Sequence, residues 1–273
     1  MPSGAWKRIR RLIPAAAALV CIFSCELFEY SPYEVPARDR GDARLAAELS
    51  RIASTDGPER SFSFAVIADI QSTYDELKDG VGKINADSSI RFVLVAGDLT
   101  QYGLLREFEW VRDGLDRLDA PYLPVIGNHD ALANGTEIFR RMFGPLDFSF
   151  TYRGARFVIF NDNVWQFDAP VPDTAWLDAE LSSAAPESLR LVPVTHIPPW
   201  GDQMTPALDT ALTEMFARHH ATLCVFAHLH NYHFHVGDAE RRPYVVADNM
   251  GGRNFVKITL AEDTIFTVER VFF

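Results

Sequence analysis

The sequence predicts an α/β fold in which strands and helices form layers, with a second sheet in the C-terminal part of the chain. Up to about residue 221, apolar strand-like segments alternate with segments of helical periodicity. After that point strand-like segments follow one another, and no helical pattern separates them. Alternation of strands and helices is typical of layered α/β folds, and the strand-rich end favours a second sheet.

The individual elements follow from the hydrophobic pattern in chain order. Three apolar strands that end in polar residues are expected over 61–71, 91–100 and 121–130, with helices over 74–85 and 104–118 between them. A hairpin with Gly154 in its turn is expected over 148–163, followed by a helix near 173–184, a strand over 190–200 and a helix near 207–219. The last strands are expected over 222–228, 232–238, 242–249, 254–260 and 264–273.

Length and charge limit the classes of function. The chain has 273 residues, of which 48% are hydrophobic and 23% charged, and this is enough for one large domain, expected over 61–273. Its net charge of −11 gives a surface that repels phosphate polymers, so bulk binding of nucleic acid is not expected. A small phosphorylated substrate is compatible with this charge if bound metal supplies local positive charge.

The N-terminal segment is typical of an exported protein. Basic residues within 7–11 precede a short apolar run from about Leu12 to Ser24. This run is too short to span a membrane as a helix and fits the apolar region of a secretory signal. Cys25 follows a small residue, which resembles bacterial lipoprotein signals in which the cysteine is lipidated and becomes the new N-terminus.

We therefore expect a lipoprotein-type signal peptide over 1–25 and a polar tether over 26–60, in which 44–54 forms a short amphipathic helix. A lipidated Cys25 would hold the domain at a membrane, on the periplasmic or cell-surface side. An uncleaved N-terminal anchor is the alternative. Both interpretations predict an exported, membrane-anchored protein.

Polar residues that can bind metals follow the apolar strands at the point where each strand ends. Functional groups in layered α/β folds gather at the carboxyl ends of strands. A single acid in such a position is commonly a turn or helix cap, but capping does not explain a whole series. The series comprises Asp69, Asp98, Asn128, His129, His196, His228 and His230.

These positions resemble the calcineurin-like metallophosphoesterase superfamily. Its ordered blocks are Asp-x-His, Gly-Asp, Gly-Asn-His-Asp/Glu, a lone His and Gly-His-x-His. The resemblance implies a four-layer α-β-β-α sandwich and hydrolysis of phosphate esters at a dinuclear metal centre with a bridging water nucleophile. The corresponding segments here, in the same order over about 60–270, are ADIQ (68–71), GDLT (97–100), GNHD (127–130), THIP (195–198) and AHLH (227–230).

The resemblance also implies which residues bind the two divalent ions. One acid, Asp98, would bridge both ions. The first ion would further bind Asp69, Gln71 and His230, and the second ion would bind Asn128, His196 and His228.

Two positions depart from the family pattern. Gln71 stands where the family usually has histidine, and Ala227 replaces the usual glycine. The alanine is a minor change if the backbone there does not need a positive φ. Carboxylate and imidazole suit zinc, iron or manganese, and the harder amide oxygen of Gln71 favours manganese. Some family branches with Asp-x-Gln are manganese-dependent diphosphatases acting on ADP-ribose-like substrates, but the motif alone does not assign that substrate.

Two residues beside the ligands are the catalytic candidates. By resemblance His129 contacts the phosphate and protonates the leaving oxygen. Asp130 would orient His129 or, alternatively, only cap a turn. The resulting function is a hydrolase of phosphate mono- or diesters. The alternative is a catalytically weak or inactive domain of the same fold that binds metal or a partner at the membrane, and Gln71 is the feature that favours it.

Overall fold

The computed structural model describes residues 31–35, 40–183, 190–262 and 266–273, so the expected signal peptide lies outside the described residues. The compact unit is Tyr33–Phe273. It begins well before residue 61, because helix α2 (Gly41–Ser54) packs Leu45 and Ile52 into the core. The segment expected to be a tether therefore contains a helix of the domain, which corrects the expected boundary.

The first sheet has the strand order β11-β10-β1-β2-β3. Strands β1 (Phe62–Ile67), β2 (Ile90–Ala96) and β3 (Tyr122–Val125) are parallel, and helices α3 (Tyr74–Asn85) and α4 (Leu105–Leu115) connect them. Strand β10 (Asn254–Leu260) pairs antiparallel with β1, and β11 (Phe266–Phe272) pairs antiparallel with β10. Pro124 lies in β3, an edge strand, where a residue without a backbone N–H is tolerated.

The second sheet has the order β4-β5-β6-β7-β9-β8. Strands β5 (Ala155–Ile159), β6 (Arg190–Val194), β7 (Cys224–Phe226) and β9 (Tyr244–Val246) are parallel. Strands β4 (Phe148–Tyr152) and β8 (His233–His235) are antiparallel to their neighbours. Arg153 and Gly154 form the turn between β4 and β5 with φ of 46° and 70°, as a tight hairpin requires.

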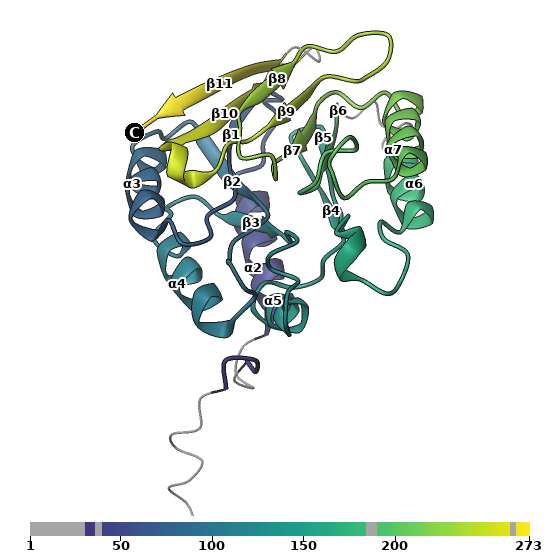
Figure 1. Ribbon diagram of the computed structural model, residues 1–273. Helices are drawn as coiled ribbons and strands as arrows, with labels where there is room; N and C mark the ends of the chain where they lie inside the picture. Colours follow the sequence, from purple (N-terminus) through teal and green to yellow (C-terminus); the bar gives the residue numbers. More distant parts are fainter. Residues whose placement is uncertain (1–30, 36–39, 184–189, 263–265) are drawn as a thin grey trace, which may run out of the picture. The chain divides into compact units, whose positions relative to one another are not determined.

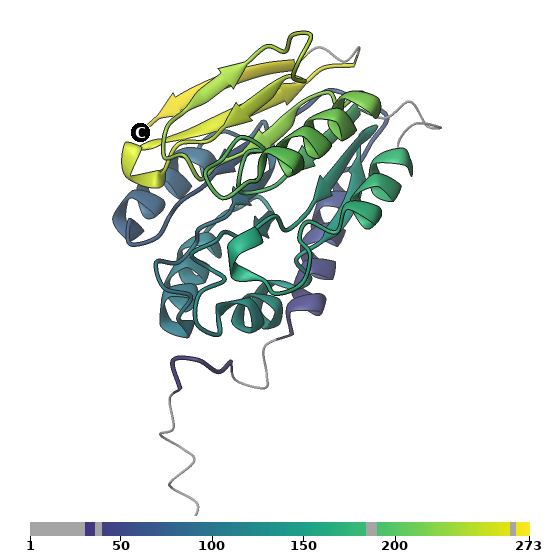
Figure 2. The same ribbon diagram turned by 45° about the vertical axis from the view of Figure 1, so that its right-hand side comes forward.

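The two sheets face each other between two layers of helices (Figures 1 and 2). Helices α3 and α4 cover the first sheet, whereas α6 (Thr174–Ser183) and α7 (Pro206–Arg218) cover the second. Aromatic rings join the sheets: Phe92 of β2 stacks on Phe64 at 5.2 Å and meets Phe157 of β5 edge-on at 5.3 Å. The expected four-layer α-β-β-α sandwich is confirmed.

Helices α2 and α5 (Gly135–Phe143) contact each other, and α2 also contacts β3 and β4, each of which is an edge strand of its sheet.

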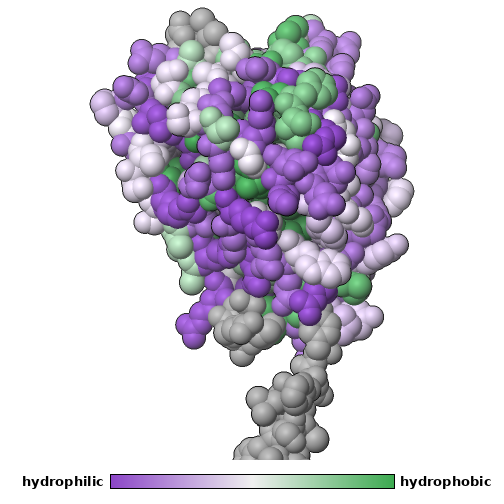
Figure 3. Space-filling model, turned by 90° about the vertical axis from the view of Figure 1, so that its left-hand side faces the viewer, coloured by the Kyte–Doolittle hydropathy of each residue, from purple (hydrophilic) through white to green (hydrophobic). Residues whose placement is uncertain are grey.

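Figure 3 views the molecule from the side of α3 and α4, where hydrophilic residues dominate the surface. Within the described part of the chain, no helix is both long and apolar enough to cross a bilayer.

Candidate metal centre

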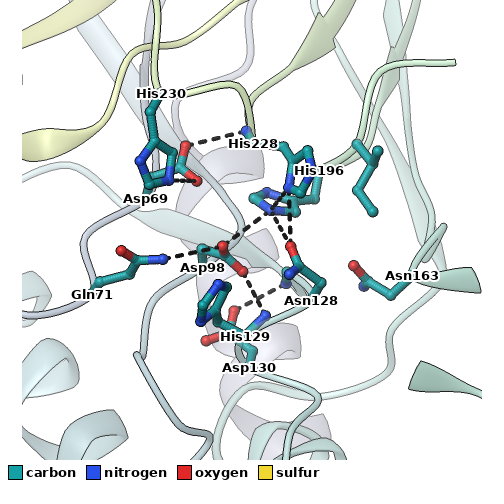
Figure 4. A network of polar contacts seen from close by, with 12 residues as sticks. Asp69, Gln71, Asp98, Asn128, His129, Asp130, Asn163, His196, His228 and His230 are labelled. Carbon is teal, nitrogen blue, oxygen red and sulfur yellow. Dashed lines mark hydrogen bonds and ion pairs between the residues drawn. The ribbon is translucent and has the colours of Figure 1, made fainter. Parts of the chain in front are cut away.

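The strand ends bring the candidate residues together. Asp69 follows β1, Asp98 follows β2, and Asn128 follows β3. His196 follows β6, and His228 follows β7. Since these strands are parallel within their sheets, their carboxyl ends meet at one edge of the sandwich. Figure 4 shows the side chains turned toward one another, as the sequence predicted.

The backbone at this edge is strained. Outside glycine, a positive φ is uncommon and costs on the order of 1–3 kcal/mol, so it persists only where the surroundings fix it. Backbone bonds hold these turns, including Asp69 N to Gly97 O at 3.0 Å and Gln71 N to Asp98 O at 3.2 Å. The strained site residues, with φ between 44° and 70°, are Asp69, Gln71, Asp98, His228 and His230.

Two glycines allow the loops to approach closely. A Cβ at Gly97 would lie 2.3 Å from Nδ1 of His196, and one at Gly127 would lie 2.1 Å from the backbone nitrogen of Asp98. Both positions therefore exclude any side chain. Ala227 is not among the residues with a positive φ, so alanine fits where the family usually has glycine.

Four ligand-type atoms converge at the second expected metal position. Nε2 of His196 lies 3.1 Å from Oδ1 of Asn128 and 3.4 Å from Oδ2 of Asp98. Nδ1 of His228 lies 3.0 Å from the same Asn128 oxygen and 3.3 Å from Nε2 of His196. These donor atoms face one another rather than solvent, as they would around a cation.

The other nitrogen of each imidazole is fixed by a hydrogen bond. Nδ1 of His196 lies 2.8 Å from the carbonyl of Ala96, so it carries the proton and leaves Nε2 free to bind a metal. Nε2 of His228 lies 3.0 Å from Oδ1 of Asp202, which leaves Nδ1 facing the site. Both rings are thus held in the tautomer that metal binding needs.

The first expected position is built around Asp69. Its Oδ1 is buried and has no well-oriented hydrogen bond, although Nε2 of His230 lies 3.2 Å away. Oδ2 accepts the backbone N–H of His228 at 3.3 Å. Nε2 of Gln71 lies 3.4 Å from Oδ2 of Asp98, so its side chain reaches the site through the bridging acid (Figure 4). A buried carboxylate oxygen without a donor fits an ion-binding role.

The electrostatics also favour a cation. Burial opposes the charge on His196, but the neighbouring Asp98 carboxylate raises the pKa of His196 well above its ordinary value. The contact with the Asp69 carboxylate likewise raises the pKa of His230. Two groups of three side chains place their ligand atoms within 4.8 Å of one another. One group is Asp69, Asp98 and His230, and the other is Asp98, His196 and His228. The two groups share Asp98, so the residues present fit two ions bridged by that acid.

His129 lies beside the site. Its backbone N–H donates to Oδ1 of Asp98 at 2.9 Å, and its Nδ1 lies 2.9 Å from the carbonyl oxygen of Gln101. That contact places the proton on Nδ1, and no hydrogen bond within the described chain engages Nε2. Nε2 is therefore the atom that can meet a substrate.

Of the two roles expected for Asp130, the structure fits the turn cap rather than the orientation of His129. Its fully buried carboxylate accepts the backbone N–H groups of Leu99, Thr100 and Gly127 and the hydroxyl of Thr100, at 2.8–3.1 Å. None of these bonds comes from the His129 ring. Asp130 therefore ties the loops after β2 and β3 together, and Gln101 rather than Asp130 orients His129.

The loop after β5 joins the site from the second sheet. Asn163 is buried and donates from Nδ2 to the carbonyl of Ile126 at 3.1 Å, next to the Gly127–Asn128 segment. Trp165, on the same loop, is 67% exposed. By contrast His233 and His235 lie on β8, outside the site, where His235 stacks on Tyr244 and the His233 ring is tilted against the same tyrosine.

Comparison with known proteins agrees with this geometry. A family model described as calcineurin-like phosphoesterase matches residues 62–232, and the chain belongs to that family. No curated protein matches the chain. The fold resembles a dimetal phosphatase from Danio rerio, with a TM-score of 0.63, 15% identity and coverage of 77% of this chain and 95% of that chain.

Two further solved structures have the same fold. A purple acid phosphatase from yellow lupin has a TM-score of 0.60 and 15% identity over 77% of this chain and 51% of that chain. GAP50, described as the anchor in the inner membrane complex of Plasmodium, has a TM-score of 0.58 and 14% identity over 77% of this chain and 84% of that chain. The protein is a metallophosphoesterase, a metal-dependent hydrolase of phosphate esters.

Proposed function

We propose that the protein hydrolyses small phosphate mono- or diesters at a dinuclear centre whose bridging ligand is Asp98. The observation that carries the proposal is the sharing of Asp98 between two sets of converging ligand atoms. Asp69, Gln71 and His230 complete the first set, and Asn128, His196 and His228 complete the second. Two divalent ions held there would supply Lewis acidity toward the phosphoryl oxygens and lower the pKa of a bridging water, the nucleophile.

The chain itself supplies the acid. His129 keeps a proton on Nδ1 through Gln101, and its Nε2 is open to a substrate. A protonated Nε2 would donate to the leaving oxygen as the ester bond breaks. Because the backbone of His129 is bonded to Asp98, the acid is positioned by the same residue that bridges the ions.

Manganese is the metal that we favour at the first position, with zinc or iron as the alternatives. Gln71 can turn its amide oxygen toward an ion, and a neutral oxygen donor suits a harder cation than imidazole does. The amide contact to Asp98 at 3.4 Å supports this assignment because it places the side chain within reach of the bridging ligand.

A partner-binding role at a membrane is the second candidate. It is favoured by Gln71, by the lipoprotein-like segment ending at Cys25, and by the likeness to a Plasmodium protein described as a membrane-complex anchor. The complete ligand set and the free Nε2 of His129 favour catalysis over this role.

Turnover of two chromogenic esters tests the proposal. Chelated protein is reloaded with manganese, zinc or iron(II), and hydrolysis of bis(p-nitrophenyl) phosphate and of p-nitrophenyl phosphate is followed. We expect metal-dependent turnover of at least one ester, with manganese most effective. Metal binding without turnover of either ester would favour the partner-binding role.

A further inference from the structure

Asp202 contacts one ligand of the metal centre from outside it. Its Oδ1 lies 3.0 Å from Nε2 of His228, whose Nδ1 faces Asn128 and His196. A carboxylate can only accept, so Nε2 must donate. The neutral ring then carries its single proton on Nε2 and presents a lone pair at Nδ1.

We propose that Asp202 is a positioning residue that fixes the tautomer and orientation of His228 and thereby sets the affinity of the second metal position. This inference rests on the proposed dinuclear function. A carboxylate behind a histidine ligand raises the basicity of the ring and locks its rotation, and the loss of such a partner typically weakens metal binding by about 10–100-fold.

Two of the other site imidazoles are held differently. Ala96 and Gln101 hold His196 and His129 through neutral backbone carbonyls that no substitution can remove. Asp202, by contrast, is a charged partner from outside the ligand set, and it acts through its side chain. The contribution of this contact to metal affinity can therefore be measured by substituting residue 202, without disturbing the backbone.

The loop that carries Asp202 is ordered. Between β6 and α7, Gly201 N donates to Pro198 O at 2.7 Å, and Met204 N donates to Gly201 O at 3.0 Å. These turns hold Asp202 at the surface with its side chain 75% exposed, whereas the side chain of His228 is 13% exposed. Removing the carboxylate thus leaves no buried cavity, so any loss of metal affinity would come from the lost contact with His228.

A matched pair elsewhere provides the control. Asp178 of α6 accepts from Nε2 of His219 at 2.7 Å, and the side chain of His219 is also 13% exposed. The two imidazoles are equally exposed and contact a carboxylate through the same atom, and neither residue of this pair belongs to the ligand set. Asp178 is 44% exposed, against 75% for Asp202, and it also pairs with Arg218. Asp178→Ala therefore removes a carboxylate–imidazole contact with no metal behind it, together with the exposed pair to Arg218.

Calorimetric titration of chelated protein with manganese alone tests the inference. We expect two ions in the wild type, and Asp202→Ala should weaken one of them by about 10–100-fold while the other stays unchanged. Asp202→Asn, which keeps an acceptor oxygen without the charge, should show a smaller loss. Asp178→Ala should bind both ions as the wild type does.

A second measurement reports the tautomer directly. In ¹⁵N NMR spectra of the chelated protein, at a pH where His228 is neutral, the wild type should carry the proton on Nε2, and Asp202→Ala should shift population to Nδ1. If Asp202→Ala binds both ions as the wild type does and keeps the same tautomer, the role proposed for Asp202 is overturned, but the dinuclear function is not. A wild type that binds none of manganese, zinc and iron(II) would overturn the dinuclear function as well.

Discussion

Asp130 accepts both the backbone N–H and the hydroxyl of Thr100, at 2.8 and 2.9 Å. The same carboxylate binds the N–H of Gly127 at 3.0 Å. One buried acid thus fastens the loop that carries Asp98 to the loop that carries Asn128. The spacing of Asp98 and Asn128, which we propose as a bridging ligand and a ligand of the second ion, depends on this link.

Replacement of Asp130 should therefore affect stability first. Asp130→Ala leaves four buried donors without an acceptor, and each unsatisfied group costs about 1–3 kcal/mol. We expect the free energy of unfolding to fall by at least about 3 kcal/mol in a urea titration. Glu137→Ala, which removes an exposed pair with Arg141, should change it by less than about 0.5 kcal/mol. Equal stabilities of the two variants would contradict the role given to Asp130.

His129→Ala should separate catalysis from metal binding. The backbone bond to Asp98 does not need the ring, so both ions should stay bound while turnover falls by about 10²-fold or more. Alkyl esters, whose leaving groups need a proton, should lose more than nitrophenyl esters. Steady-state kinetics and metal analysis on the same preparation measure both effects, and loss of an ion from this variant would show that His129 is a ligand.

Gln71→His should change the metal preference. Residue 71 has a φ of 44°, and histidine tolerates this region better than most residues do, so the fold should be kept. Imidazole is softer than an amide oxygen, so the metal that best restores activity to chelated protein should shift from manganese toward zinc or iron. If both proteins share one activation profile, residue 71 does not reach the first ion.

Cys25→Ala tests the expected anchor. The basic residues, the apolar run and the Ser-Cys pair predict lipidation at Cys25. The variant should leave the membrane fraction or accumulate as a precursor of higher mass. Fractionation and intact-mass measurement report the outcome, and a variant identical to the wild type in both would exclude a lipoprotein.

The sequence was sufficient to predict the layers and the convergence of the ligands. Asp69, Asp98 and His228 each follow an apolar run, and parallel strands bring such ends to one edge, so the sequence alone could place these three residues. The hairpin turn at Gly154 was equally visible, because its geometry requires a positive φ.

The contacts behind the ligands could not be predicted. Ala96 and Gln101 hold histidines through backbone carbonyls, which every residue carries and which leave no mark in a sequence. Asp202 lies 26 positions from His228, at no recognisable spacing. The direction of the Asp130 carboxylate depends on how two loops pack. Helix α2 was predicted as part of a polar tether because its apolar stripe is short.

The central claim is that Asp98 bridges two ions, and metal content after reloading with manganese and dialysis tests it most directly. The wild type should hold two ions per chain. Asp98→Asn keeps an oxygen to accept the N–H of His129, so thermal unfolding should show a folded protein. It should nevertheless lose both ions, because Oδ2 of Asp98, which faces both Gln71 and His196, would become an amide nitrogen that cannot bind a metal. Asp178→Asn should keep two ions. A folded Asp98→Asn protein that retains two ions and normal turnover would contradict the dinuclear centre.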